Sequence, residues 1–177
     1  MLTPLRNRHR GATLIEVIVA IAILALLTTF AAGEFLLWIQ NTQIRTVSEA
    51  VKEGIASARS EAIKRNEQVQ INFDADYKGW RIVRTSDQTV IRTENGLSDF
   101  PSIVITPDLA GSTSITFSSL GRALQTNSDN SVPFGSLQVD NTKMDPGDSR
   151  ELQIRITTAG SVRMCDPNKA FPSPVAC

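Results

Sequence analysis

Histidine is nearly absent from this sequence of 177 residues, since the only one, His9, lies among the first ten. The rest of the chain therefore lacks the commonest general base and the commonest metal ligand of proteins. There are only two cysteines, and neither has a plausible base partner that would make it a nucleophile. We therefore expect a protein that is not an enzyme and that holds no metal and no cofactor.

An excess of charge of either sign is also missing. The 18 Lys and Arg residues balance 18 Asp and Glu residues, so the formal net charge is zero. Three of the basic residues, Arg6, Arg8 and Arg10, lie within residues 1–11, and without them 15 basic residues face 18 acidic ones. Because neutralisation of phosphates dominates non-specific binding to nucleic acid, a role in DNA binding would require a local basic patch.

A short basic segment, residues 1–11, precedes a long apolar run that reaches Ile39. Seventeen residues from Val17 to Gly33 carry no charge, which is near the lower limit for a membrane-spanning helix, and residues 35–39 extend the run past Glu34. The arginines before the run hold that end in the cytoplasm. The pattern predicts a single membrane-spanning segment, with the rest of the chain on the other side of the membrane.

Three kinds of N-terminal segment share this pattern: a cleaved signal peptide, a simple anchor helix, and a prepilin segment that is cut before its apolar run. Glu16 distinguishes them, because a carboxylate costs about 2.5–3.5 kcal/mol at a membrane centre, although less near an edge. A signal peptide or simple anchor has no use for it. In a filament, if the chain is cut after Gly11, Glu16 can neutralise the new amino group of Ala12 on a neighbouring subunit. Glu16 therefore favours the prepilin interpretation.

Residues 10–16, RGATLIE, resemble the N-terminus of type IV pilins and pseudopilins. The resemblance implies cleavage by prepilin peptidase between Gly11 and Ala12, N-methylation of Ala12, and a charge pair made by Glu16 during filament assembly. Two positions depart from the pattern. Ala12 stands where Phe is most usual, and Gly33 stands where many members have a helix-bending Pro, although Gly weakens a helix less than Pro does.

Beyond Trp38 the apolar residues recur at steps of three and four, with charged residues between them, which is typical of an amphipathic helix. We expect one helix from Thr13 to about Arg65, apolar all round in its first half and half-buried in its second. The residues expected on its buried face are Ile44, Val47, Val51, Ile55, Ala58 and Ala62.

Alternating and β-rich stretches follow the expected helix. Asp74–Lys78 is expected to form a turn, Ala159-Gly160 a hairpin turn, and residues 125–132 and 141–149 loops. The predicted strands are Val69–Phe73, Gly79–Arg84, Thr89–Thr93, Ser102–Thr106, Thr113–Ser118, Ser136–Asp140, Leu152–Thr157 and Ser161–Met164.

The two cysteines, Cys165 and Cys177, lie at the C-terminus with eleven residues between them. In an exported chain such a pair is typical of a disulfide that closes a small loop. Two free thiols would be the alternative in a cytosolic protein.

A long helix followed by antiparallel strands resembles the GspH/FimT/FimU group of minor pilins and pseudopilins. The segments that carry this resemblance are residues 56–62 (ASARSEA), Ile115-Thr116-Phe117 with Gly121-Arg122, and the ending Gly160 to Pro167. It implies an α+β type IV pilin fold with a leader at residues 1–11, a transmembrane and filament-core helix at 12–39, and a periplasmic domain at 40–177 that includes the disulfide loop. It also implies an inner-membrane protein whose partners are prepilin peptidase and other minor and major pilins.

Three functions fit such a protein. The first is a minor pilin that helps to initiate assembly at the tip of a type IV pilus, the filament used in adhesion, twitching motility and in some cases DNA uptake. The Cys165-Asp166-Pro167 ending resembles the type IV pilus members of the group and favours this function.

The second function is that of a FimT-like DNA receptor for natural transformation. It would use a basic patch of Arg122, Arg155, Arg163 and Lys169, although Ser161 stands where the first arginine of the FimT-like Gly-Arg-x-Arg element is expected. The third is a GspH-type minor pseudopilin of a type II secretion system.

Overall fold

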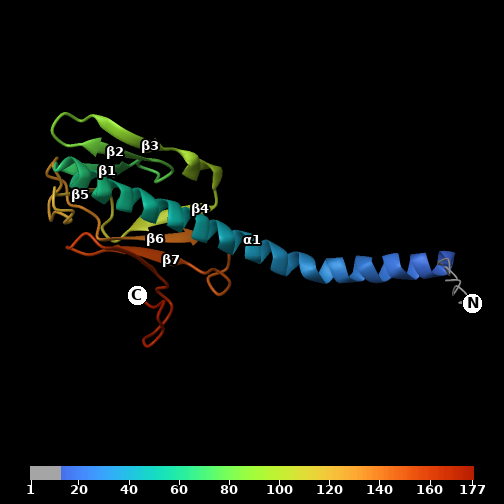
Figure 1. Ribbon diagram of the computed structural model, residues 1–177. Coiled ribbons are helices and arrows are strands. Elements are labelled where there is room, and N and C mark those ends of the chain that lie inside the picture. The colour runs from blue at the N-terminus through green and yellow to red at the C-terminus, as the bar shows by residue number, and fades with distance from the viewer. Residues whose placement is uncertain (1–12) are drawn as a thin grey trace, which may run out of the picture. The chain divides into compact units, whose positions relative to one another are not determined.

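The structure, a computed structural model, describes residues 13–177, without the side chains of residues 30–32. The chain divides between Leu36 and Leu37 into two compact units. The expected arrangement of one long helix followed by antiparallel strands is confirmed, and the strands form two sheets. Helix α1 runs from Leu14 to Arg65, as its periodicity predicts (Figure 1).

The end of α1 is fixed by backbone geometry. Asn66 has a left-handed φ of 53°, a conformation that asparagine tolerates better than most residues. The amide of Glu67 then donates to the carbonyl of Ala62 at 3.2 Å, and the amide of Asn66 donates to that of Ile63 at 3.2 Å. These two bonds form a Schellman motif, which satisfies carbonyls that the helix itself leaves unpaired and turns the chain into the first strand.

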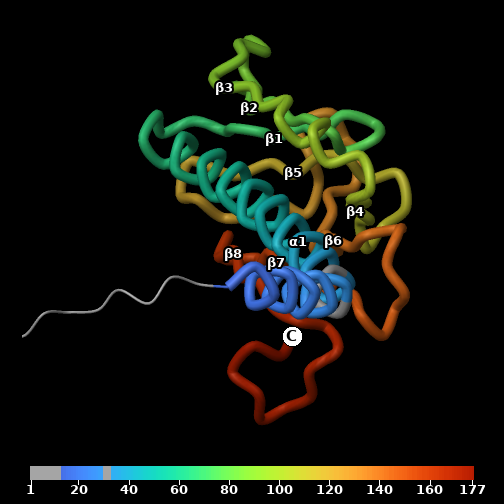
Figure 2. Tube along the Cα trace, turned by 90° about the vertical axis from the view of Figure 1, so that its right-hand side faces the viewer, coloured from blue at the N-terminus to red at the C-terminus, as the bar shows by residue number. Residues whose placement is uncertain are grey.

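Eight antiparallel strands follow in two sheets of four. The first sheet has the order β3-β2-β1-β5 and the second the order β4-β6-β7-β8 (Figure 2). The bounds are β1 Val69–Phe73, β2 Trp80–Arg84, β3 Val90–Glu94, β4 Ile103–Pro107, β5 Ser114–Phe117, β6 Ser136–Asn141, β7 Leu152–Ile156 and β8 Val162–Cys165, with a short 3₁₀ helix, η1, at Gly96–Asp99. Every predicted strand is present, and β7 and β8 form the hairpin expected around Ala159-Gly160.

The second half of α1 supplies one side of the core. All six residues predicted on its buried face are at most 1% exposed, and they share one apolar cluster with side chains from both sheets. Trp80 of β2 lies directly on the helix backbone at Gly54, where an added Cβ would be 2.7 Å from its ring. Arg92 of β3 covers the same ring at 5.4 Å. The absence of a side chain at Gly54 thus allows the first sheet to approach the helix closely.

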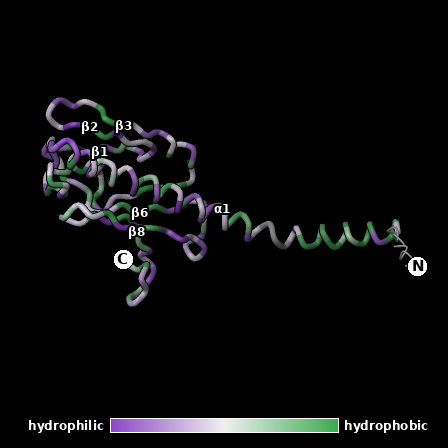
Figure 3. The backbone as a smooth tube through the Cα atoms, in the orientation of Figure 1, coloured by the Kyte–Doolittle hydropathy of each residue, from purple (hydrophilic) through white to green (hydrophobic). Residues whose placement is uncertain are grey.

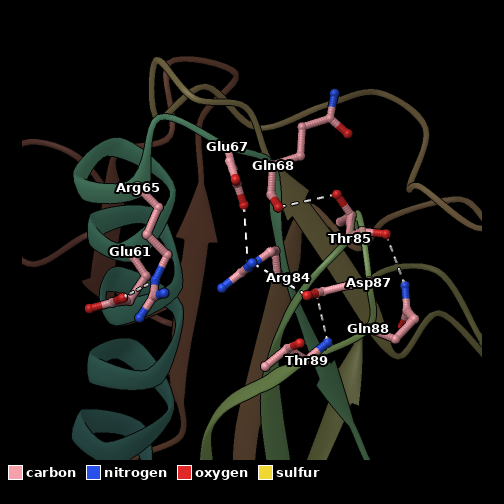
Figure 4. A network of polar contacts seen from close by, with 9 residues as sticks. All are labelled: Glu61, Arg65, Glu67, Gln68, Arg84, Thr85, Asp87, Gln88 and Thr89. Atoms are coloured by element: carbon pink, nitrogen blue, oxygen red, sulfur yellow. Dashed lines mark hydrogen bonds and ion pairs between the residues drawn. The ribbon is translucent and has the colours of Figure 1, made fainter.

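A polar network joins the end of α1 to the β2–β3 hairpin (Figure 4). Arg84 lies 3.3 Å from Glu67 and 3.3 Å from Asp87, while Arg65 bonds to Glu61 within the last turn of the helix. The bond from Arg65, together with the charges of Lys64 and Arg65, outweighs partial burial and lowers the pKa of Glu61 below its ordinary value.

One loop prediction needs correction, and the other is confirmed with an unexpected feature. Asn141 belongs to β6 rather than to the following loop, because it pairs with Ile103 of β4. The stretch 125–132 has no regular structure but is not simply solvated, since Asn127 is 3% exposed. Its amide donates to the carbonyl and the hydroxyl of Ser114, and its oxygen accepts a bond from Thr116. The loop is therefore held on β5 by buried polar contacts.

Candidate functional site

The N-terminal part of α1 presents an apolar surface that nothing covers within its own unit. The large apolar side chains between Leu14 and Leu27 are 48–79% exposed, and the hydropathy colouring shows the same concentration of apolar residues (Figure 3). An apolar surface of this extent is stable only when lipid or other apolar helices cover it.

Among the described residues, no single helix is long and apolar enough to cross a membrane. Two stretches of α1, Leu14–Thr29 and Gly33–Arg65, are bent by 45° relative to each other, and they are long and apolar enough only when they are taken together.

Thr13 and Glu16 form the first turn of the helix. The amide of Glu16 donates to the carbonyl of Thr13 at 3.1 Å and to its hydroxyl at 3.3 Å, so Thr13 is the N-cap. Threonine followed three residues later by glutamate is the capping-box pattern, a signal in the sequence that our interpretation of Glu16 did not use. Glu16 forms no ion pair with any residue in 13–177. Its expected partner, the amino group of Ala12, lies outside the described residues together with Gly11, and cleavage and methylation there stay predictions.

Cys165 and Cys177 form the expected disulfide, with a Cα–Cα distance of 5.0 Å. The amide of Asp166 also donates to Val175, at 2.7 Å, and that of Cys177 donates to Asp166, at 3.3 Å. The base of the C-terminal loop is thus closed by both covalent and backbone bonds. Phe171 in this loop is 93% exposed.

The four basic residues expected to form a patch come from three different places. Arg155 of β7 and Arg163 of β8 are direct partners in register, and both are exposed. Arg155 also donates to the carbonyl of Cys177 at 3.0 Å. Lys169 lies in the C-terminal loop, at a cavity of about 390 Å³ that is also lined by Asp140, Glu151 and Asp166. Arg122 follows β5 of the other sheet, so the register brings together only Arg155 and Arg163.

Three segments that carry the family resemblance meet at one point. Arg59, from residues 56–62, donates to the carbonyl of Gly121 at 3.0 Å. Gly160 of the β7–β8 turn is so close that an added Cβ would lie 1.9 Å from the same carbonyl oxygen. Gly121 and Gly160 both have φ above 70°, a region that favours glycine. These residues therefore join the helix, the segment after β5 and the β7–β8 hairpin, a contact that no pattern in the sequence predicts.

No group of three or more His, Cys, Asp and Glu side chains that could hold a metal ion occurs in the part of the chain that the structure describes.

Comparison with known proteins gives the family. The model of the family described as type II transport protein GspH matches residues 48–160, more than half of the chain. The chain belongs to the GspH family. A second model, the prokaryotic N-terminal methylation motif, matches residues 6–32 of this GspH-family protein, a range that contains Gly11, Ala12 and Glu16. This motif and the apolar helix together indicate membrane anchoring. A search of curated proteins finds no match.

Solved structures of pilin-like proteins share the fold. The type IV minor pilin FimU of Pseudomonas aeruginosa has a TM-score of 0.57 and 17% identity, over 77% of this chain and 98% of FimU. The minor pseudopilin EpsH of the type 2 secretion system of Vibrio cholerae has a TM-score of 0.53 and 12% identity, over 72% of this chain and 99% of EpsH. At such identities the likeness concerns the fold, and it confirms the expected type IV pilin architecture of this GspH-family chain.

Proposed function

We propose that this GspH-family protein is a minor pilin that helps to initiate a type IV pilus at the filament tip. After prepilin peptidase cleaves between Gly11 and Ala12 and Ala12 is N-methylated, residues 12–39 hold the chain in the inner membrane as a single pass. Residues 40–177 then lie in the periplasm, where they meet other minor and major pilins. The observation that carries this proposal is the exposed apolar helix with Glu16 in its first turn, because it requires apolar partners and supplies a charge that can set their register.

The protein then works by packing and has no catalytic step. Burial of the apolar helix against neighbouring helices drives association. Pairing Glu16 with the amino group of Ala12 on a neighbour offsets the cost of placing either charge in apolar surroundings. Membership of a family of structural subunits supports this interpretation.

A type IV pilus is favoured over a type II secretion system by the C-terminal loop. The disulfide from Cys165 closes the ending that resembles the pilus members of the group. Deletion of the gene in its host separates the two systems. We expect loss of surface pili and of twitching motility with normal protein secretion, and the reverse result would assign the chain to secretion.

The test of the charge pair is Glu16→Gln. Glutamine also suits the third position of a capping box, so this variant keeps the local helix contacts and removes only the charge. Glu34→Gln is the matched control, since Glu34 is an exposed carboxylate of the same helix. We expect Glu16→Gln to reach the membrane in normal amount but to be lost from sheared filaments, while Glu34→Gln is incorporated normally. Normal incorporation of Glu16→Gln would contradict the proposed assembly mechanism.

Binding of DNA is a second candidate function, supported by the adjacent exposed side chains of Arg155 and Arg163. The full chain in detergent micelles can be titrated with duplex DNA over a salt series. If this function holds, Arg163→Ala weakens binding and reduces the salt slope by about one unit. Absence of binding at low salt would eliminate this candidate.

A further inference from the structure

One edge of the second sheet, beside the second half of α1, is open over Val162–Cys165 of β8; directly after it Asp166 forms a bridge with Ala176 of the C-terminal segment. Strand β8 is the last in the order β4-β6-β7-β8. The amide of Thr157 donates to the carbonyl of Ser161 at 3.0 Å, and hydrogen-bonded pairs alternate along an antiparallel ladder. Arg155–Arg163 and Gln153–Cys165 are therefore hydrogen-bonded pairs. The backbone amides and carbonyls of Val162 and Met164 consequently point away from β7, and within residues 13–177 they form no backbone bond to a segment outside the sheet.

A continuous groove separates this edge from the helix. It consists of three cavities of about 570, 430 and 340 Å³. The first two share Arg45 and Met164, and the last two share Lys52 and Ala56. Met164 and Val162 of β8 line the strand side of this groove, so the open backbone groups lie along it.

The groove is positively charged at one end. The cavity beside Val162 is lined by Lys52 and Arg59, together with Ala56, Ser60, Ile63 and Ser161, and by no carboxylate of the described residues. Ile63 remains 49% exposed there. The adjoining cavity, which shares Lys52, is also lined by Glu49 and Glu53, so the positive charge is confined to the end beside Val162, and a ligand with apolar contacts and negative charge suits that end.

We propose that this groove binds an extended acidic segment of a neighbouring pilin-like subunit, which pairs with β8 as a fifth strand of the second sheet. Open strand edges accept extended backbone because it alone matches their row of donors and acceptors. Alternate side chains of the added strand point to one face, where they contact Ile63 and Ala56, and its carboxylates lie near Lys52 and Arg59. This inference depends on the proposed function in one respect, namely that the added strand belongs to a neighbouring pilin subunit.

The test uses the full chain in detergent micelles and a peptide that alternates valine and glutamate. A peptide with lysine in place of glutamate is the control for charge. We expect the acidic peptide to bind and to slow hydrogen exchange of the amides of Val162 and Met164, but not of those in β3, which is also an edge strand. Slowed exchange in both strands, or binding of both peptides, would show unspecific adsorption and overturn the proposal.

Two pairs of variants test the contacts. Met164→Pro removes the outward amide hydrogen and breaks no hydrogen bond to β7. Met164→Leu is the control, because it keeps that amide and a similar side-chain volume. We expect Met164→Pro to weaken binding about tenfold and Met164→Leu to leave it unchanged. Lys52→Glu should transfer the preference to the lysine peptide, whereas Lys143→Glu, the same change outside the groove, should not.

Equal binding by Met164→Pro and the unchanged chain, or no binding up to about 1 mM peptide, would overturn the strand pairing. Because no filament is needed for these measurements, their failure is distinguishable from failure of the Glu16 experiment. Peptide binding together with normal incorporation of Glu16→Gln would retain the strand site and reject the charge-pair mechanism of assembly.

Discussion

The contact between Gly160 and Gly121 gives the sharpest prediction for a single residue. Gly160→Ala combines a left-handed backbone with a Cβ that would lie 1.9 Å from the carbonyl oxygen of Gly121. Gly111 also has a left-handed φ, of 81°, but an added Cβ there would meet nothing within 4 Å. We expect Gly111→Ala to lower the free energy of unfolding by about 1 kcal/mol. Gly160→Ala should lower it by about 1–3 kcal/mol more, since the backbone must move.

Urea unfolding of the two variants measures this difference. Equal losses would mean that only the backbone conformation matters and that the approach of the two glycines has no energetic role.

Tyr77 provides a second prediction, because it is the only tyrosine of the chain. It is 7% exposed, and its hydroxyl donates to the carbonyl of Ser112. Burial, and secondarily the charge of Asp108, raises the pKa of Tyr77 above its ordinary value of 10.0. The folded state therefore disfavours the phenolate. Stability from this group is complete below pH 10.0 and is lost as the pH rises from there toward the raised pKa of the folded state.

The phenolate absorbance in the near ultraviolet follows Tyr77 alone. We expect the native chain to titrate at higher pH than the chain in urea. Asp108→Asn should reduce this difference without abolishing it, since burial is the larger cause. Identical titrations of the native and unfolded chains would contradict the prediction.

At the scale of elements, regular periodicity made much of the fold predictable. Ile44 and Ala62 delimit an apolar stripe with helical spacing, and alternation in Val69–Phe73 has the period of a strand; both patterns record directly which face is buried. The grouping of strands into two sheets leaves no such record, because β1 pairs with β2 and with the distant β5. The buried amide of Asn127 was equally hidden, since its partners come from another segment. A polar residue in a loop is ordinarily exposed.

The candidate site was predictable where a local pattern carries the chemistry. Glu16 and the cysteine pair stand out in the sequence because each is unusual at its position. The basic patch depended on the order of strands, so the sequence could not show that Arg155 and Arg163 are cross-strand partners or that Lys169 lies beside carboxylates. The groove along β8 was missed for the same reason, because an edge strand is defined only by which strands pair.

The C-terminal loop gives a prediction for an element. Cys165 and Cys177 are 12 positions apart, and cross-linking a loop of that size stabilises by roughly 3 kcal/mol in the chain-entropy model. Replacing both cysteines with alanine should lower the free energy of unfolding by up to about that amount. The free energy of unfolding should also fall more steeply with urea concentration, because the unfolded chain exposes more surface without the cross-link. The unchanged chain after reduction is the control and should match the double variant. An unchanged midpoint of urea unfolding would mean that the disulfide does not stabilise the fold. The loop would then serve only to present its surface, which includes Phe171 at 93% exposure.

At the scale of the whole molecule, the two units have opposite needs. The unit from Leu37 to Cys177 contains its own core, and every residue of the buried apolar cluster lies at or after Ile44. The apolar side chains from Leu14 to Leu27 belong to no such cluster. A chain with this division requires an apolar environment for one unit and water for the other, as expected of a membrane-anchored subunit that is later packed into a filament.

Removal of residues 1–36 tests this division. We expect the remaining fragment to stay monomeric without detergent and to unfold in one cooperative transition, because it keeps all of the core. Its midpoint in urea should equal that of the globular unit in the full chain, measured in detergent by the fluorescence of Trp80, with Trp38→Phe in both proteins to isolate that signal. A lower midpoint for the fragment would mean that the N-terminal half of α1 contributes to the stability of the globular unit. Aggregation of the fragment with an unchanged midpoint would instead indicate that the globular unit itself exposes an apolar surface that associates. The groove beside β8 is the first candidate for that surface, and Ile63→Ser in the fragment tests it, since this variant should then be monomeric.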